Sequence, residues 1–372
     1  MKSMGIVFSN IYDDSLRELT GVRTVASLPF GGRYRQIDFV LSNLSHSGIY
    51  NVGLITKYNY RSLMDHLGNC AEWDLNRKNE GLVFLPPFAS GNTGGIYKGK
   101  LEALYSAKSF LSKSGYENVV ICDSTVLCNI DYRAALQQHQ KSGADITAIV
   151  SCVSEQEKRK LPLVIKCGKN GKATELLVEA PIKKGYLAGM GMFIINREKL
   201  LKEIEEAYTK GYTHLERDLI QRKFNSKEWT VNSYLFDGVV LRNQDIVGYY
   251  ENSMALLKEE VRKDLFKPDR AIFTKVRDET PTYYAKGSRV EDCILADGCT
   301  IRGKIEKSVL FRGVEIEEGA EVKRSILMQG AKVCRGAKLD CVILDKDVTV
   351  TANTELKGTP AHTVIIQKGE TV

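Results

Sequence analysis

The residues whose types and positions could do chemistry follow two apolar runs. MGIVF ends at Phe8, and NVVICD ends at Asp123. Short apolar runs of this kind predict strands that are buried on both faces of a parallel sheet. Ligands of such sheets gather at the carboxyl ends of the strands. We therefore expect the functional site in the residues after Phe8 and around Asp123.

Charge and cysteine usage argue against several other kinds of site. The chain has 53 basic and 46 acidic residues, a formal charge of +7, and the basic residues are scattered along the sequence. This pattern favours attraction of small anions over a nucleic-acid surface. The nine cysteines include no C-x-x-C pair. We expect reduced, mostly buried thiols rather than a disulfide framework or a zinc site.

The elements that must position these residues are expected to form two domains. The chain has 372 residues, 43% hydrophobic and 27% charged, as in ordinary globular proteins. Up to about residue 250, apolar runs alternate with helical stretches, which predicts an α/β domain with a mainly parallel, Rossmann-like sheet. The predicted boundaries are 1–260 for this domain, 261–284 for a charged linker with two prolines, and 285–372 for a second domain.

An internal repeat predicts the structure of the second domain. Residues 308–324 (SVLFRGVEIEEGAEVKR) and 325–341 (SILMQGAKVCRGAKLDC) are near-copies with a period of 17. Small or branched apolar residues preceded by glycine recur about every six positions, the hexapeptide pattern of a left-handed parallel β-helix. The repeats contain no histidine that could take a substrate's proton. We therefore expect a structural or assembly role rather than acyl transfer.

The amino-terminal sequence and the hydropathy predict a cytoplasmic location. The first residues, MKSMGIVFSN, lack the apolar core of a signal peptide. No stretch approaches the roughly 18 apolar residues that a membrane helix needs.

Residues 28–49 carry a resemblance to a known family. LPFGGRYRQIDFVLSNLSHSGI resembles the P-F-G-G-x-Y-R-x-I-D-F-x-L-S-N-x-x-x-S-G-I signature of ADP-glucose pyrophosphorylases, the glucose-1-phosphate adenylyltransferases. The resemblance extends through most of the chain. It implies a nucleotidyltransferase-like α/β domain, a left-handed β-helix, and a Mg²⁺-dependent reaction of ATP with glucose 1-phosphate that yields ADP-glucose and diphosphate for glycogen synthesis.

The chain departs from the family's catalytic pattern where phosphate is handled. In the family's loop, G-G-x-G-T-R-L, glycines let backbone N–H groups approach the triphosphate and the arginine neutralises it. The replaced positions are Asn10, Ile11 and Asp13 for glycines, Ser15 for the arginine, Val25 and Ala180 for two lysines, and His214 for the second of two magnesium carboxylates. The first carboxylate matches Asp123, which is either a remaining Mg²⁺ ligand or a cap of the following turn.

These losses predict a protein that is inactive or very weak alone. Nucleotidyl transfer depends on positive charge at fixed points, and one lost donor typically reduces the rate about 10²- to 10³-fold. Even two losses should lower turnover at least about 10⁴-fold. The resemblance then implies a GlgD-type regulatory subunit that does not bind Mg²⁺ productively, although Mg²⁺ is the family's cofactor. It also implies a heterotetramer with a catalytic subunit, or association of the chain with itself, and we expect the β-helix to supply much of the interface with the catalytic subunit.

Other family-matched positions keep candidate binding residues. Tyr97 matches a tyrosine near the nucleotide, with packing as the alternative, and Glu179 keeps an acid that could hydrogen-bond a sugar. Four basic residues match or adjoin positions that bind phosphate-bearing effectors, with solvated surface arginines as the alternative: Arg23, Arg33, Arg35 and His66. His46 and His139 are expected at the surface.

Two other functions stay open from the sequence. The chain could be an independently active sugar-1-phosphate nucleotidyltransferase, with Lys57 and Lys98 supplying positive charge near the phosphates. It could also be a non-enzymatic module that senses a sugar phosphate or a nucleotide. A neighbouring gene for a chain with an intact G-G-x-G-T-R-L loop would favour the regulatory subunit over both.

Overall fold

Segments that are distant in sequence combine into two units, each with its own core. The computed structural model describes residues 2–11, 13–87, 96–113, 115–154, 157 and 159–372. Unit 1 comprises residues 1–11, 40–58 and 68–240, and unit 2 comprises residues 12–39, 59–67 and 241–372. The β-helix thus clusters with two amino-terminal segments, so the units do not coincide with the stretches 1–260 and 285–372.

Unit 1 is built on a mixed sheet of nine strands among the described residues. These strands are β1 (Ser3–Phe8), β4 (Asn51–Ile55), β5 (Gly81–Leu85), β6 (Asn118–Asp123), β8 (Ile146–Ser151), β9 (Leu161–Cys167), β10 (Ala173–Ala180), β11 (Leu187–Asn196) and β12 (Val231–Leu235). The main path runs β10-β9-β11-β6-β1-β4-β5, with β8 beside β11 and β12 beside β8.

The strand directions agree with the predicted α/β class in one half of the sheet and add an antiparallel half. Strands β6, β1, β4 and β5 are parallel neighbours, as the alternating pattern predicts. Strand β11 is antiparallel to β6, β8 and β9, and β9 is antiparallel to β10. Only the short segments 168–172 and 181–186 join β9, β10 and β11, and short connections favour antiparallel neighbours because parallel ones need a long crossover.

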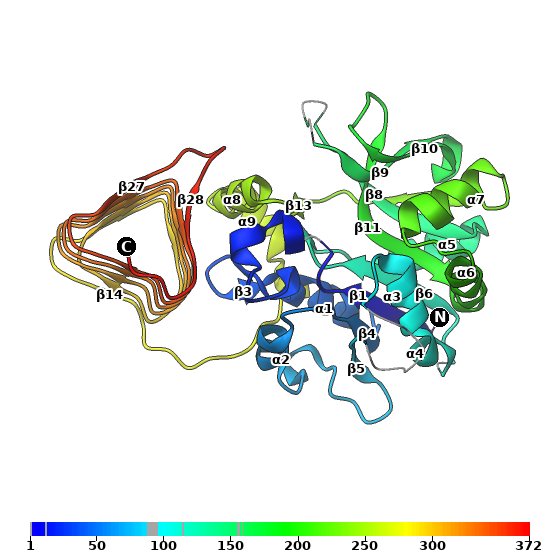
Figure 1. Ribbon diagram of the computed structural model, residues 1–372, viewed down its shortest axis with the longest axis horizontal. Helices are drawn as coiled ribbons and strands as arrows, with labels where there is room; N and C mark the ends of the chain where they lie inside the picture. Colours follow the sequence, from blue (N-terminus) through cyan, green and yellow to red (C-terminus); the bar gives the residue numbers. More distant parts are fainter. Residues whose placement is uncertain (1, 12, 88–95, 114, 155–156, 158) are drawn as a thin grey trace. The chain divides into compact units, whose positions relative to one another are not determined.

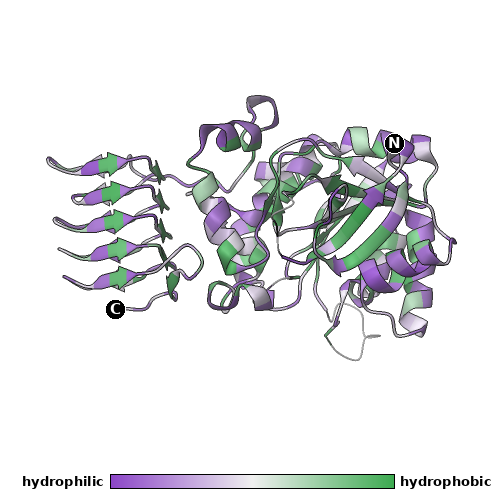
Figure 2. Cartoon of the chain, turned by 90° about the horizontal axis from the view of Figure 1, so that it is seen from above, coloured by the Kyte–Doolittle hydropathy of each residue, from purple (hydrophilic) through white to green (hydrophobic). Residues whose placement is uncertain are grey.

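The helices of unit 1 flank this sheet (Figure 1). They are α3 (Lys100–Ser106), α4 (Lys108–Ser112), α5 (Tyr132–Ser142), α6 (Arg197–Thr209), the π-helix η6 (Leu215–Gln221) and α7 (Arg222–Asn225). Helix α5 begins at Asp131, whose carboxylate accepts a hydrogen bond from the Arg133 N–H at 2.9 Å, and ends at Gly143 with φ +59°. Figure 2 shows the hydrophobic strands that these helices cover.

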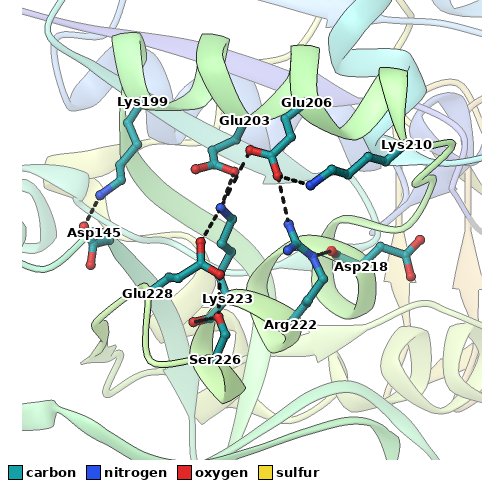
Figure 3. A network of polar contacts seen from close by, with 10 residues as sticks. All are labelled: Asp145, Lys199, Glu203, Glu206, Lys210, Asp218, Arg222, Lys223, Ser226 and Glu228. Carbon is teal, nitrogen blue, oxygen red and sulfur yellow. Dashed lines mark hydrogen bonds and ion pairs between the residues drawn. The ribbon is translucent and has the colours of Figure 1, made fainter.

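A network of charged side chains holds α6 and α7 together (Figure 3). The Lys223 ammonium lies 3.2 Å from Glu203 and 2.7 Å from Glu228, and both Lys223 and Glu203 are buried. Buried charges persist when they are paired in this way. The network supports the packing of η6, which continues directly into α7 and carries one of the site residues described below.

One of the two histidines expected at the surface is buried. His139 on α5 is only 6% exposed, and its Nδ1 lies 2.8 Å from the Thr147 hydroxyl of β8. The surface prediction for His139 was wrong because α5 packs this face against the sheet, where a hydroxyl satisfies the ring. His46 is partly exposed.

Unit 2 contains the β-helix, whose strands form three parallel five-stranded sheets among the described residues. The strands are β14 (Tyr283–Tyr284), β15 (Arg289–Glu291), β16 (Ile294–Leu295), β17 (Thr300–Ile301), β18 (Lys304–Glu306), β19 (Val309–Leu310), β20 (Glu315–Ile316), β21 (Glu321–Lys323), β22 (Ile326–Leu327), β23 (Lys332–Val333), β24 (Lys338–Asp340), β25 (Val342–Leu344), β26 (Thr349–Val350), β27 (Glu355–Lys357) and β28 (Val364–Ile366). Each coil contributes one strand to each face of a triangular prism (Figure 1).

The register of the β-helix confirms the 17-residue repeat. Ile316 pairs with Val333, which pairs with Val350, so residues 17 apart stack along one face. The apolar positions of the repeat fill the interior and are fully buried: Val314, Ala320, Ala331 and Ala337. The preceding glycines at two corners have positive φ, for example +67° at Gly313, a conformation that other residues seldom adopt.

The interior of the β-helix should be sensitive to truncation. Leu339 on β24 is buried and stacks between Val322 and Leu356 of the adjacent coils. We expect Leu339→Ala to lower the free energy of unfolding by about 2–5 kcal/mol, because it leaves a cavity between fixed coils. The neighbouring Lys338 is exposed, so Lys338→Ala should change it by less than about 0.5 kcal/mol in the same urea denaturation experiment. Equal effects of both changes would contradict this account.

The remaining elements of unit 2 connect the β-helix to its amino-terminal segments. They include β2 (Pro29–Phe30), β3 (Tyr34–Arg35), α2 (Arg61–Leu67), β13 (Leu241–Arg242), α8 (Ile246–Ala255) and α9 (Glu259–Leu265), while α1 (Gln36–His46) runs from unit 2 into unit 1. On α8 the Tyr249 hydroxyl donates to the Pro29 carbonyl, and the Tyr250 hydroxyl donates to the Arg324 carbonyl, both at 2.7 Å. No helix in the described part of the chain is long and apolar enough to cross a membrane.

Candidate functional site

The carboxyl edge of the parallel strands in unit 1 carries Asp123 and a row of buried hydroxyls. Phe8 at the end of β1 is in register with Asp123 at the end of β6 and with Ile55 at the end of β4. The next residues along these three strands are Ser9, Ser124 and Thr56, and their buried hydroxyls have no hydrogen-bond partner among the described residues. This is the edge at which the sequence predicts the site.

Asp123 is held in one orientation by the turn that follows it. Its Oδ1 accepts hydrogen bonds from the Thr125 N–H and the Thr125 hydroxyl, both at 2.9 Å, and the residue is 2% exposed. Burial raises the pKa of Asp123, an effect that the positive charge of Lys100 opposes. The turn-capping role considered from the sequence is therefore present in the structure.

A buried lysine accompanies Asp123 at this edge. Lys100, the first residue of α3, forms an ion pair with Glu216 of η6, and both side chains are almost inaccessible, at 10% and 11%. Burial works against the charged lysine, but Glu216 and Asp123 together raise the pKa of Lys100 above its usual value. We call Asp123, Lys100 and Glu216 the acid–lysine cluster.

Sequence reasoning did not identify the acid–lysine cluster. Lys100 lies three positions after Tyr97, and Glu216 lies two positions after His214. An unexpected cation within the family's nucleotide-binding segment was the available signal. Its ion pair with Glu216 joins residues 116 positions apart, which no local pattern reveals.

The described residues at the replaced positions of the nucleotide loop pack, form hydrogen bonds or face solvent. In unit 2, the Asp13 carboxylate accepts a hydrogen bond from the Val25 N–H at 2.7 Å, and Val25 is fully buried. Ser15 is exposed at the end of the short helix η1 (Asp13–Ser15). In unit 1, Ile11 packs against the core and Asn10 is half-buried. The carboxylate of Asp13 thus uses a backbone donor of the kind that a phosphate would need.

The other replaced positions also have structural roles or face solvent. Ala180, at the end of β10, packs against a small apolar cluster, and the adjacent Glu179 is exposed with φ +51°. His214 is exposed, and its N–H donates to the Asp218 carboxylate at 2.9 Å. Burial acts to raise the pKa of Asp218, but hydrogen bonds from Arg217 and from the backbone N–H groups of residues 213 and 214 lower it to about 2. Asp218 therefore caps η6.

Tyr97 is committed to a contact with the sheet. Its hydroxyl donates to the Thr56 carbonyl at 2.6 Å, and the ring packs against the core of unit 1. The Lys57 ammonium lies 5.8 Å from the centre of this ring, and Lys98 is exposed. Of the cations in this segment, Lys100 is the one that interacts with Asp123.

Most of the predicted effector residues line one pocket in unit 2. Its basic side chains come from β3, α2, the segment before β14 and the β-helix: Arg33, Arg35, His66, Lys275, Arg277, Arg312 and Lys346. We call this the basic pocket. Sequence analysis identified Arg33, Arg35 and His66 but missed the other four, because they belong to stretches where single basic residues follow no local pattern.

Hydrogen bonds on one wall of the basic pocket orient its predicted residues. The Arg35 guanidinium donates to the Ser62 carbonyl at 2.6 Å and to the Ser62 hydroxyl at 3.0 Å. His66 Nε2 lies 2.6 Å from Asp38 Oδ1, while the other oxygen of Asp38 accepts from the Arg35 N–H at 2.9 Å. Burial lowers the pKa of His66, although Asp38 opposes the change. Burial also lowers the pKa of Arg35 to about 10.

The opposite wall of the basic pocket comes from the β-helix and lacks a full set of partners. Arg312 is only 8% exposed, and its buried Nε has no hydrogen-bond partner among the described residues. Burial, together with the charges of Arg35 and Arg23, lowers the pKa of Lys346 to about 7. The clustered cations lower one another's pKa values, and the Arg312 guanidinium has an N–H without an acceptor among the described residues. A bound anion would supply both the negative charge and the acceptor.

Arg23 lies behind the basic pocket rather than in its wall. Its guanidinium forms an ion pair with Asp345 at 2.9 Å, and both side chains are nearly inaccessible. Arg23 still acts on the pocket through its charge, since it contributes to the low pKa of Lys346. Arg33, Arg35 and Arg312 line the pocket, so a bound phosphate would contact these residues rather than Arg23.

The residues around Asp123 do not fit a magnesium site. In the described part of the chain, no group of three or more His, Cys, Asp or Glu residues is placed to hold a metal ion. Mg²⁺ requires oxygen ligands in an octahedral arrangement and usually keeps several waters. At this edge the carboxylates of Asp123 and Glu216 interact with an ammonium group, and His214, at the position of the second family carboxylate, supplies no oxygen ligand.

Two family models match the two kinds of structure seen in the chain. The nucleotidyl transferase family matches residues 14–238. A family described as the GlmU-like C-terminal hexapeptide region matches residues 280–362. The fold and these matches together define a nucleotidyltransferase-like α/β domain followed by a hexapeptide β-helix.

Individual relatives specify the group within this class. The "Glycogen biosynthesis protein GlgD" of Bacillus subtilis is 36% identical over 98% of this chain and 96% of its own length. The GlgD protein of Geobacillus stearothermophilus is 35% identical over 86% of the chain and 83% of its own length. The "Glucose-1-phosphate adenylyltransferase" of Clostridium perfringens strain 13 is 31% identical over 80% of the chain and 76% of its own length. The chain belongs to the ADP-glucose pyrophosphorylase (glucose-1-phosphate adenylyltransferase) family, and within it to the GlgD type.

Proposed function

We propose that the chain is a regulatory, catalytically deficient subunit of ADP-glucose pyrophosphorylase in cytoplasmic glycogen biosynthesis. One observation carries this proposal. Positive charge gathers in the basic pocket of unit 2, whereas at the edge of the parallel strands in unit 1 the chain's own lysine occupies the carboxylates. Such a protein can bind an anionic effector but is poorly equipped to stabilise a triphosphate in a transition state.

The proposed partner is a catalytic subunit of the same family, in a heterotetramer. The β-helix is the element suited to assembly, because its regular faces are rigid and its interior is fully packed. In this proposal Mg²⁺ acts in the catalytic partner and is not bound productively by this chain.

The proposed ligand of the basic pocket is a phosphorylated metabolite that acts as an effector. Arginine forks suit the oxygens of a phosphate group, and a buried guanidinium with an unsatisfied N–H offers a strong hydrogen bond. The pocket joins α2 and β3 to the β-helix within one unit. A bound anion would therefore link two parts of unit 2 that are far apart in sequence.

The proposal is tested by reconstitution with a catalytic subunit. ADP-glucose formation is measured for the catalytic subunit alone and for the co-purified pair, with and without phosphorylated metabolites. We expect the pair to differ from the catalytic subunit in rate or in effector response. Arg312→Gln in this chain should reduce the effector response about tenfold or more, because it removes charge-assisted hydrogen bonds.

The matched control is Arg302→Gln, which changes an exposed arginine of the same β-helix. It should leave the effector response unchanged. A rate and an effector response that are both identical with and without this chain, in a pair shown to be assembled by size-exclusion chromatography, would contradict the proposed function.

A second candidate function rests on the buried hydroxyls at the sheet edge. Ser9, Thr56 and Ser124 lack partners among the described residues, and such groups can hydrogen-bond a sugar or nucleotide without charge neutralisation. A sensing module would bind glucose 1-phosphate or ATP in calorimetric titrations of this chain alone, whether or not a catalytic subunit is present. Binding without any effect on a co-purified partner would favour this second function.

A further inference from the structure

We propose that Lys100 is a built-in counter-cation that closes the edge around Asp123 to divalent metal ions. The chain thus carries, as a covalent part of itself, the positive charge that an exchangeable ion would otherwise bring to these carboxylates. This inference concerns metal binding and does not depend on the regulatory role proposed above.

The placement of the lysine supports this assignment. Lys100 is the first residue of α3, and its N-cap, Gly99, lies so close to the Thr213 carbonyl that a Cβ there would come within 2.3 Å of the oxygen. The N–H of Leu101 also donates to the Thr213 carbonyl at 3.0 Å. The start of α3 is therefore fixed against the segment that leads into η6, which carries Glu216. The ion pair joins two elements that are in contact, and its side chains are almost inaccessible, unlike the solvent-exposed pairs of a protein surface.

The positive charge of Lys100 weakens the attraction of the two carboxylates of the cluster for a divalent ion. Asp123 and Glu216 both act electrostatically on Lys100, and this interaction outweighs the effect of burial on the ammonium. A metal ion would have to displace the ammonium from Glu216 or share the cluster with it. Two like charges in a buried, low-dielectric site repel strongly.

Space around Asp123 is also restricted. Gly191 on β11 has φ +68°, and a Cβ at this position would lie 2.9 Å from the Asp123 Cβ and 3.3 Å from its Oδ2. The other carboxylate oxygen, Oδ1, is committed to Thr125. Backbone on one side of the carboxylate and a hydrogen-bonded turn on the other thus limit the directions from which an ion can approach Asp123.

The test compares Mn²⁺ binding by the full-length chain and by Lys100→Met, which keeps the length of the side chain and removes its charge. Free Mn²⁺ is measured by electron paramagnetic resonance during titration, so no enzymatic activity is needed. We expect the unmodified chain to bind no Mn²⁺ that depends on Asp123. Lys100→Met should bind about one Mn²⁺ per chain, because two carboxylates without a counter-charge then attract it. This ion should be lost in Lys100→Met/Asp123→Asn.

Thermal unfolding provides an independent readout and covers the case of a poorly folded variant. Lys100→Met should be less stable than the unmodified chain, and Mn²⁺ should restore part of that loss, as a ligand of the native state does. If Lys100→Met does not fold, Lys100→Met/Glu216→Gln is titrated instead, and its single unpaired carboxylate, Asp123, should still bind Mn²⁺, although more weakly. Lys98→Met, on an exposed side chain two residues away, should behave like the unmodified chain. Asp123-dependent Mn²⁺ binding by the unmodified chain, or none by a folded Lys100 variant, would overturn the proposal.

Discussion

Purified alone, the chain is expected to form ADP-glucose from ATP and glucose 1-phosphate at least about 10⁴-fold more slowly than a catalytic member of its family under the same conditions. The loop positions that lack glycine include Asp13, whose carboxylate already occupies the Val25 N–H. The positions of two lysines are taken by the buried Val25 and by Ala180. The chemistry depends on fixed positive charge around phosphate, and none of these residues supplies it.

The comparison enzyme for this measurement is the 31% identical adenylyltransferase of Clostridium perfringens, assayed at equal concentration with saturating Mg²⁺. Asp123→Asn in this chain identifies contaminating activity, because any turnover that survives the change cannot come from a site that needs Asp123. A rate within about 100-fold of the comparison enzyme, abolished by Asp123→Asn, would show that another set of residues neutralises the phosphates. That outcome would favour the independently active nucleotidyltransferase considered from the sequence.

Sulfate binding to the basic pocket should weaken about tenfold per pH unit above about pH 7.5. Burial and the neighbouring arginines hold the pKa of Lys346 at about 7, so its amine is mostly neutral above that pH. A bound anion restores the charged form, and binding must then take up a proton. Sulfate does not itself titrate in this range, so the slope of affinity against pH in calorimetric titrations reports the protein. His66 is neutral there, because burial lowers its pKa.

Lys346→Met checks the assignment in two ways. It should remove most of the pH dependence of sulfate binding. Without sulfate it should also stabilise the protein at pH 7. The folded-state pKa of Lys346 lies below its unfolded value of about 10.4, so the unfolded chain binds more protons between these values. Stability therefore rises with pH across this window, and Lys346→Met should add about 2 kcal/mol near pH 7 and little near pH 10. A slope unchanged in Lys346→Met would contradict the role of this lysine.

The sequence was sufficient for the architecture because both parts of the fold have local periodicity. Buried runs such as MGIVF and NVVICD became adjacent parallel strands, and the 17-residue repeat became stacked coils with glycine at two corners. The sequence did not reveal that the strands around β11 are antiparallel, since the direction of pairing depends on which strands meet in space. The misjudged burial of His139 has the same cause, because the face that α5 presents to β8 is decided by packing.

For the candidate sites, the sequence shows which residues of the family pattern are missing, whereas the folded chain shows which residues form the sites that are present. A lost glycine or lysine can be identified at its own position, as at Asp13 or Val25, because the family motif is continuous. The acid–lysine cluster and the basic pocket consist of residues from separate segments. Lys100 and Glu216 are 116 positions apart, and Arg35 and Lys346 line one pocket from opposite ends of the chain. Electrostatic interactions depend on distance in space, which only the folded chain establishes.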